Sequence, residues 1–368
     1  MNIMKNFSSI KILALILAYS SFAIADHHAS SEHDSQIKYV SYSQLGNPAD
    51  VLEVKKEASR ALSSGEVRVK VLAAPINPSD LLQISGNYGV DPVLPARPGS
   101  EGVGRVIEVS PETKSLKVGQ LVLLASGSSW TEEIVAPAEG FLPLPNLGPI
   151  SAEVIEQLAM SAVNPLTALL MLTSYGDIEP GQWIVQSAAN SAVGGYVIQL
   201  AKQRGIKTVN IVRREGLADD LMAKGADVVL IDGPDLTAQI AEATDNASIM
   251  LALDPVGGDT YGRLANSLGY GGTLVTYGVL SGKPATLDTG KIIFNDTRLR
   301  GFWLYKWYQK ATMQEMQAAF GQVIPLIANG TLKANIDSRY TVDQIKQAVT
   351  RAWEGGRNGK VLIVPNHL

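Results

Sequence analysis

The segment between residues 183 and 214 constrains the fold more than any other part of the chain. Two buried-looking apolar runs, at 183–188 and 208–212, flank a turn of small residues and a helical stretch at about 193–204. A strand that enters a helix through such a turn, followed by a second buried strand, is typical of the first βαβ unit of a nucleotide-binding sheet. The sequence therefore predicts a doubly wound, parallel α/β domain.

The turn has the composition of a phosphate-binding site. Small side chains at Ala188, Ala189, Ser191, Ala192 and Gly194 allow a pyrophosphate to approach backbone N–H groups at a helix N-terminus, where the helix dipole favours negative charge. The spacing is A-x-x-S-x-x-G rather than G-x-G-x-x-G. Small residues also occur where a helix packs tightly on a strand, so the turn alone leaves both interpretations open.

Two arginines at the end of the second strand sharpen the prediction. Arg213 lies 22 residues after Ser191, where NAD-specific sites carry an acidic residue for the ribose hydroxyl. Arg213 and Arg214 instead offer cationic, bidentate donors that suit a 2′-phosphate. NADPH is therefore the expected cofactor.

The patterns on either side of this unit predict one domain inserted into another. Residues 37–162 begin with short β-patterned runs, at 51–55, 67–73, 103–109 and 121–124, between prolines and glycines, which indicates a compact antiparallel β unit. Residues 163–304 alternate buried strands with helices, which predicts a six-stranded parallel sheet. Residues 305–368 return to the β unit with two helices and a last apolar strand. The predicted strands of the parallel sheet are at 183–188, 208–212, 227–231, 249–254, 272–277 and 298–304; the return segment has helices at 313–328 and 342–353 and a strand at 360–364.

The residue types that are missing exclude several chemistries. The chain has no cysteine, and its four histidines are His27, His28, His33 and His367, all outside the predicted folded body. Disulfides, thiol nucleophiles, Ser-His pairs and the usual zinc ligands are therefore excluded, and no metal is expected. The first three histidines either bind stray divalent metal or belong to a solvated tail. A net charge of -4, without basic clusters interleaved with aromatics, argues against a nucleic-acid partner.

The N-terminus is predicted to be a signal peptide, residues 1–25, followed by a linker, residues 26–36. Lys5 and Lys11 precede an apolar run, and Ala23-Ile24-Ala25 supplies the small-x-small pattern that signal peptidase reads. The first 59 residues contain no arginine, which favours a bacterial secretory signal over a mitochondrial presequence. The expected location is the bacterial periplasm, or the cytoplasm if the signal is not used. The alternative is an anchor that stays attached; after cleavage no stable membrane span is expected.

Several motifs resemble the medium-chain dehydrogenase/reductase superfamily over about residues 36–365. They are Asn-Pro-Ser-Asp at 77–80, Gly-Asn-Tyr-Gly at 86–89, Pro-Gly-Ser-Glu-Gly-Val-Gly at 98–104, Asn-Pro-Leu-Thr-Ala at 164–168, Ala-Asn-Ser-Ala-Val-Gly at 189–194 and Arg-Gly-Phe-Trp-Leu at 300–304. The last three together are most similar to the zinc-free, NADPH-dependent 2-enoyl thioester reductases known from mitochondria. The resemblance implies a GroES-like β-rich catalytic domain with an inserted Rossmann domain, and a homodimer is expected.

Residue roles follow from that resemblance. It implies that Tyr88 is the proton donor and that Ser100 stands where the zinc enzymes carry a metal-binding histidine. Ala192 departs from the glycine that is usual in the turn. The resemblance implies that NADPH is lined by Asn164, Asn190, Ser191, Ala192, Val193, Arg213, Arg214, Tyr277, Gly278, Val279, Leu280, Phe302, Trp303, Leu304, Tyr305 and Lys360.

The implied reaction is hydride transfer to the β-carbon of an α,β-unsaturated thioester and protonation of the α-carbon, which requires a hydrogen-bond donor at the thioester oxygen. Plainer interpretations stay open: Tyr88 as a packing residue, the aromatic residues 302–308 as a hydrophobic patch or dimer contact, and Lys360 as a strand-edge charge. Two other functions also remain. One is a zinc-independent NADPH:quinone or enone oxidoreductase on the same fold, and the other is a non-catalytic NADPH-binding protein.

Overall fold

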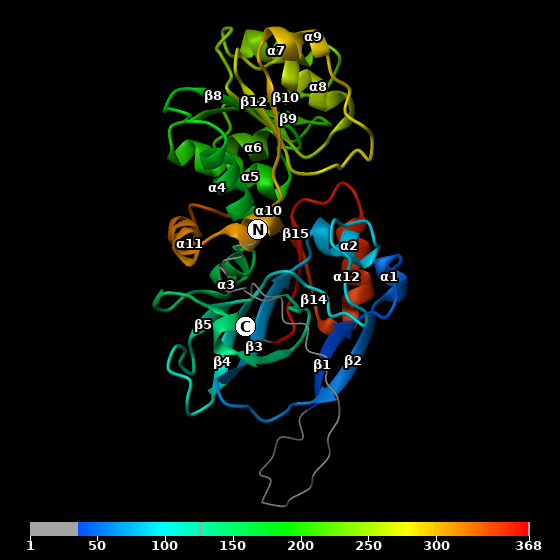
Figure 1. The fold of residues 1–368 in the computed structure, drawn as a ribbon, viewed down its shortest axis with the longest axis vertical. Helices are drawn as coiled ribbons and strands as arrows, with labels where there is room; N and C mark the ends of the chain where they lie inside the picture. Colours follow the sequence, from blue (N-terminus) through cyan, green and yellow to red (C-terminus); the bar gives the residue numbers. More distant parts are fainter. Residues whose placement is uncertain (1–35, 125–126, 367–368) are drawn as a thin grey trace, which may run out of the picture.

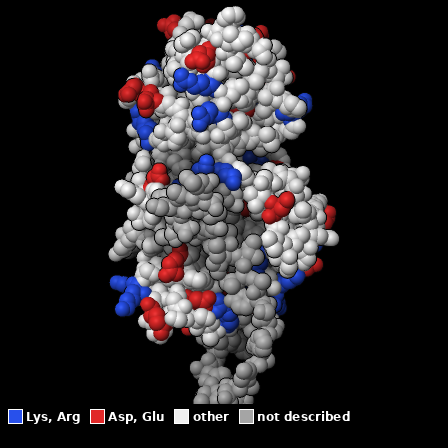
Figure 2. Space-filling model, viewed as in Figure 1, with Lys and Arg blue, Asp and Glu red and all other residues white. Residues whose placement is uncertain are grey.

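The protein forms two lobes stacked end to end in the computed structural model, which describes residues 36–124 and 127–366 (Figure 1). The predicted signal peptide, the predicted linker up to residue 35 and all four histidines lie outside the described residues. In Figure 2 acidic and basic side chains are scattered singly or in small groups over the part of this face that grey atoms do not cover.

The first lobe is built on a seven-stranded sheet to which both ends of the described chain contribute. Its long central strand, β3 (Glu66–Pro75), pairs antiparallel with β4 (Val103–Val109), β6 (Glu133–Pro137) and β15 (Lys360–Ile363). The predicted return of the C-terminal strand to this lobe is therefore confirmed. The remaining strands of the sheet are β5 (Leu121–Leu123), β7 (Leu142–Pro143) and β14 (Ile336–Tyr340), the last parallel to β15.

One predicted strand of this lobe begins differently. Residues 51–55 read as a strand from their pattern, but the chain first forms a short helix, α1 (Pro48–Val51), and only then β2 (Glu53–Ala58), which pairs with β1 (Gln36–Ser41). The reason is local, since the side chain of Asn47 caps α1 by accepting from the N–H of Ala49 and Pro48 occupies the first helical turn.

The second lobe is a six-stranded, fully parallel sheet in the order β10-β9-β8-β11-β12-β13. This is the doubly wound order predicted from the sequence, with its topological switch point between β8 and β11. The strands are β8 (Trp183–Gln186), β9 (Lys207–Val212), β10 (Val228–Ile231), β11 (Leu251–Asp254), β12 (Thr273–Thr276) and β13 (Arg298–Gly301).

Helices bury both faces of this sheet. Ile184 packs in one hydrophobic core and its neighbour Val185 in another, because successive side chains of a strand point to opposite faces. The first face is covered by α4 (Asn164–Ser174), α5 (Ala192–Gln203) and α6 (Ala218–Lys224) (Figure 1). The second face is covered by α7 (Leu236–Ala243) and α8 (Gly258–Asn266), and α9 (Thr289–Phe294) lies at the same end of the molecule (Figure 1).

The two lobes share one hydrophobic core. It runs from Leu72 and Val103 in the first sheet, through Leu158, to Leu169 and Ile184 in the second lobe. The helices that complete the fold are α2 (Pro78–Ile84), α3 (Ala152–Ala159), α10 (Leu304–Lys310), α11 (Met313–Ala328) and α12 (Ile345–Trp353), with 3₁₀ turns at Ala138–Gly140 and Val342–Gln344.

No single helix within 36–124 and 127–366 is both long enough and apolar enough to cross a membrane. Judged by length and composition alone, α3 and α4 of this part of the chain are long and apolar enough when taken together, although they are bent by 56° relative to each other.

Candidate active site

The turn after β8 forms the close helix approach that its small residues predict. Ser191 caps α5, its side chain accepting from the N–H of Gly194 at 3.1 Å. A Cβ on Gly194 would lie 2.5 Å from the carbonyl oxygen of Ala189, so only glycine allows the helix to pack this closely on the turn. The turn thus packs tightly on the start of a twelve-residue helix, whose dipole favours negative charge at this end.

Both arginines predicted for the 2′-phosphate lie at the same edge of the sheet. They directly follow β9, which pairs in parallel with β8, and both are exposed. Arg214 also reaches the first lobe, donating to the carbonyl oxygen of Gly356 at 3.4 Å. Exposed guanidinium groups beside a helix N-terminus suit a phosphate monoester.

A buried carboxylate at the switch point was not predicted from the sequence. Asp254 ends β11, is fully buried, and accepts from the Ser187 hydroxyl and from the N–H of Gly257 at 2.7 Å. It thus joins the loop after β8 to the loop after β11. Burial raises the pKa of Asp254, and the two hydrogen bonds oppose that effect. The only sequence feature that could have indicated this role is an acidic residue directly after the apolar run Leu-Ala-Leu.

The loop after β12 presents a hydroxyl to the same region. Tyr277 directly follows β12, and its buried oxygen makes no hydrogen bond of normal geometry among the described residues, although the Ser191 side chain lies close to it. Burial and the neighbouring Asp254 raise the pKa of Tyr277 well above its usual range, and the nearby Ser191 side chain partly opposes this effect. A buried hydroxyl of this kind beside a phosphate turn fits a site completed by a polar ligand. Gly278 packs close to Pro255, whereas Val279 and Leu280 are exposed.

Tyr88 and Trp303 meet between the lobes. Tyr88 follows α2 in the first lobe and Trp303 follows β13 in the second, and the indole Nε1 donates to the Tyr88 hydroxyl at 2.8 Å. Their rings cross edge to face with centroids 5.7 Å apart. A Cβ on Gly89 would lie 2.8 Å from the indole, so Gly89 permits this approach.

The proton of Tyr88 remains available in this arrangement. An indole N–H only donates, so the Tyr88 oxygen is the acceptor and its own O–H is free to donate elsewhere. Burial raises the pKa of Tyr88, which keeps the hydroxyl protonated at neutral pH. Tyr305 lies next to Trp303, with ring centroids 5.1 Å apart.

The rest of the aromatic segment splits into two roles. Phe302, Leu304, Trp307 and Tyr308 pack against the shared core, and the Tyr308 hydroxyl donates to the carbonyl oxygen of Ala162 at 2.7 Å. These four side chains therefore pack on the core, whereas the ring of Trp303 contacts both Tyr88 and Tyr305.

A buried polar cluster joins the lobes near the start of α4. Asn77 donates through Nδ2 to Glu101 at 2.8 Å, and its Oδ1 accepts from Asn164 at 3.1 Å and from the Lys360 Nζ at 2.5 Å. Burial lowers the pKa of Lys360 and raises that of Glu101, while the attraction between the two opposes both effects. Lys360 is thus not an exposed strand-edge charge. Asn77 and Glu101 were not predicted as site residues, although both lie in the quoted motifs.

The structure brings most of the predicted residues to one place. Ser191, Arg213, Tyr277 and Trp303 follow four different strands of a parallel sheet, so all lie at its carboxyl edge, where ligands of doubly wound folds bind. Asn190 is exposed at the turn, and Ala192 and Val193 open α5. Asn164 and Lys360 belong to the buried cluster.

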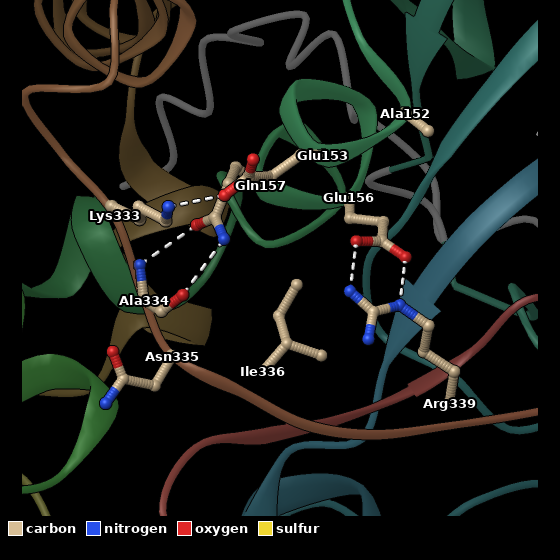
Figure 3. A pocket seen from close by; sticks show the side chains of 9 residues that line it. All are labelled: Ala152, Glu153, Glu156, Gln157, Lys333, Ala334, Asn335, Ile336 and Arg339. Carbon is tan, nitrogen blue, oxygen red and sulfur yellow. Dashed lines mark hydrogen bonds and ion pairs between the residues drawn. The ribbon is translucent and has the colours of Figure 1, made fainter.

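A separate cavity of about 470 Å³ lies between α3 and the segment that leads into β14 (Figure 3). Its charges are mutually paired, Lys333 with Glu153 and Arg339 with Glu156. It contains none of the predicted site residues. Within the described ranges, no group of three or more His, Cys, Asp or Glu side chains is placed to hold a metal ion.

Comparisons with known proteins agree on the fold. Residues 63–146 match the family model of the alcohol dehydrogenase GroES-like domain, and residues 192–322 match the family model described as zinc-binding dehydrogenase. The Etr1p/NADP/crotonyl-CoA complex has a TM-score of 0.82 and 29% identity, covering 90% of this chain and 100% of that chain. A putative NADPH:quinone reductase from Bacillus thuringiensis has a TM-score of 0.80 and 28% identity, covering 90% and 99%.

Curated relatives are more similar in sequence. The mitochondrial enoyl-[acyl-carrier-protein] reductase of Rattus norvegicus is 36% identical over 329 residues, which are 88% of this chain and 87% of the relative. The Homo sapiens enzyme of the same name is 34% identical over 332 residues, 88% of each. These mitochondrial relatives contradict the predicted export to a bacterial periplasm, so that expectation is wrong. The absence of arginine from the first 59 residues was the feature that favoured a bacterial signal over a mitochondrial presequence.

Proposed function

Because this chain belongs to the medium-chain dehydrogenase/reductase family, among the enoyl thioester reductases, we propose that it reduces the 2,3 double bond of 2-enoyl thioesters with NADPH. The observation that carries the proposal is the Tyr88 hydroxyl, held by Trp303 between the lobes with its own proton free. The chain is an oxidoreductase, and its cofactor is NADPH.

The residues present fit that cofactor. The N-terminus of α5, the close approach at Gly194 and the buried Tyr277 hydroxyl all follow strands at the carboxyl edge of the sheet and would face the pyrophosphate, and Arg213 and Arg214 would hold the 2′-phosphate. When bound, NADPH supplies the hydride that the β-carbon receives. The other residues proposed to line the cofactor are Asn164, Asn190, Ser191, Ala192, Val193, Gly278, Val279, Leu280, Phe302, Trp303, Leu304, Tyr305 and Lys360.

Tyr88 has two related tasks in the proposed mechanism. As the double bond is reduced, negative charge develops on the thioester oxygen, where a fixed donor is most effective. The α-carbon then needs a proton, which Tyr88 supplies directly or through a water molecule. Trp303 holds the hydroxyl oxygen in place, so that little reorganisation is needed when the charge appears.

A second candidate function is reduction of quinones, which the structural similarity to a putative NADPH:quinone reductase favours. The higher identity of the enoyl reductases places it behind the first proposal. NADPH oxidation with crotonyl-CoA and with a naphthoquinone separates the two. We expect turnover of crotonyl-CoA; turnover of the quinone alone would contradict the proposal.

We also propose a homodimer that forms through the edge of the parallel sheet. β13 is an edge strand whose four residues are all exposed, and its N–H and C=O groups are a template for pairing with another strand. Ile293 and Phe294 of α9, just before this strand, are 72% and 79% exposed. A similar solved structure is a heterodimer, Etr1p/Etr2p from Candida tropicalis.

A further inference from the structure

In the buried cluster between the lobes, each hydrogen bond has a defined donor and a defined acceptor. Four of its polar side chains, Glu101, Asn77, Asn164 and Lys360, are each less than a tenth exposed, as is the neighbouring carboxylate of Asp80. These four come from four separate segments: the loop before β4, the loop before α2, the first turn of α4 and the start of β15. Asn77 is the hub, because it contacts the other three.

Glu101 is an acceptor on every side. Its Oε2 accepts from the N–H groups of Ala162 and Val163, both at 2.9 Å, and its Oε1 accepts from the Nδ2 of Asn77 at 2.8 Å. A backbone N–H can only donate, so the Oε2 that faces Ala162 and Val163 is an acceptor by geometry. The three groups that face Glu101 are all donors, and two of them are the consecutive N–H groups just before α4.

The amide of Asn77 has one orientation that satisfies all its neighbours. When Nδ2 points toward Glu101, Oδ1 points toward Asn164 and Lys360. It then accepts from the amide of Asn164 and from the ammonium of Lys360. Rotated by half a turn, the amide would set its NH₂ against these two donors and its oxygen against the carboxylate. The contacts through this amide would then be lost, although Glu101 would keep the N–H groups of Ala162 and Val163 and Lys360 would keep the carbonyl oxygen of Ile76.

We propose that Glu101 is a positioning residue: by fixing the amide of Asn77, it presents the oxygen that orients Lys360 and Asn164 for cofactor binding. The proposal rests on the proposed function only in placing Lys360 and Asn164 at the NADPH. If the proposal is right, the affinity for NADPH depends on which of these groups donates and which accepts. Buried side chains of the same size with the wrong donors and acceptors would not support binding.

Two nearly isosteric substitutions test this order. Glu101→Gln introduces an amide whose NH₂ must face either two backbone N–H groups or the NH₂ of Asn77. Asn77→Asp places a second carboxylate against Glu101. The double variant restores every contact, since the new glutamine accepts from Ala162 and Val163 and donates to the new aspartate, which still accepts from Asn164 and Lys360.

We expect each single variant to lower the melting temperature and to raise the Kd of NADPH, measured by binding titration, by about tenfold or more, as when a charged hydrogen bond is lost. The double variant should return to within about twofold of the wild-type Kd, because the two changes are coupled and not additive. A double variant that binds NADPH no better than the weaker single variant would overturn the proposal.

A matched control separates positioning from general loss of stability. Glu156 is also a buried glutamate, 4% exposed, paired with Arg339 beside the separate cavity, with Oε2 2.7 Å from Nη2 (Figure 3). Glu156→Gln should lower the melting temperature and leave the Kd of NADPH unchanged. An unchanged Kd in Glu101→Gln would also overturn the proposal.

Two further outcomes are informative. If the single variants do not fold, a soluble double variant that binds NADPH supports the proposal and an insoluble one overturns it. A wild-type protein that binds NADPH but does not reduce crotonyl-CoA contradicts the proposed function alone, because the binding measurements do not depend on turnover.

Discussion

At the scale of single residues, the sequence predicts groups that act through a local pattern and misses those that act through distant partners. Arg213 and Arg214 follow a strand, and their position is set by that strand alone. Glu101 and Asp254 were missed because their partners are remote: Glu101 binds residues 24 to 62 positions away, and Asp254 binds Ser187. No periodicity encodes such contacts.

Arg213 is predicted to decide between the two cofactors. Because it is exposed at the carboxyl edge of the sheet beside the phosphate turn, Arg213→Ala should remove about 2 kcal/mol or more of the preference for NADPH over NADH, as expected for a charged hydrogen bond. The measurement is kcat/KM for each cofactor in wild type and variant. Equal values for NADH and NADPH in the wild type would contradict the assignment.

At the scale of elements, the parallel sheet was the easiest part to predict and the β lobe the hardest. Strands of the second lobe are buried on both faces and therefore appear as continuous apolar runs. In the first lobe a cap and a proline place Val51 in α1, so the strand predicted at 51–55 begins only at Glu53. The pairing of β15 with β3 joins residues nearly 300 positions apart, and it was suggested only by the apolar character of the last strand.

The first turn of α5 offers a test with an internal control. A Cβ on Gly194 would lie 2.5 Å from Ala189 O, whereas a Cβ on Gly195 would meet nothing closer than 4.0 Å. Gly194→Ala should therefore lower the free energy of unfolding by about 1–3 kcal/mol through overpacking and weaken NADPH binding. Gly195→Ala should be neutral or stabilising by up to about 1 kcal/mol, because alanine favours helix. Equal unfolding curves for the two variants would refute the close packing at the turn.

At the scale of the whole molecule, the two lobes share one hydrophobic core, and the candidate site lies between them. The hydrophobic core is continuous from the first sheet to the second, and the polar contacts Trp303–Tyr88, Asn164–Asn77 and Arg214–Gly356 also cross between the lobes. An inserted domain was predictable from the change of pattern along the chain. The contacts that join the lobes were not, because each links segments that look unrelated in sequence.

Substitutions of the exposed apolar residues beside β13 test the proposed dimer. Replacing both Ile293 and Phe294 with aspartate puts charges where a second copy would pack beside β13. We expect light scattering after size exclusion to show a dimer for the wild type and a monomer for the double variant, with both folded. A variant that stays dimeric would place the interface elsewhere.

The central claim is that Tyr88 is the proton donor in enoyl reduction, and Tyr88→Phe tests it most directly. The substitution removes the hydroxyl and keeps the ring against Trp303. At saturating NADPH, reduction of crotonyl-CoA should fall by about 10²-fold or more, the usual range for a general acid or oxyanion donor, with the Kd of NADPH nearly unchanged. Any quinone reduction should change little, since water can protonate a hydroquinone anion. Tyr270→Phe, at a tyrosine that is 74% exposed, is the control and should behave as wild type. Crotonyl-CoA reduction at the wild-type rate by Tyr88→Phe would contradict the account.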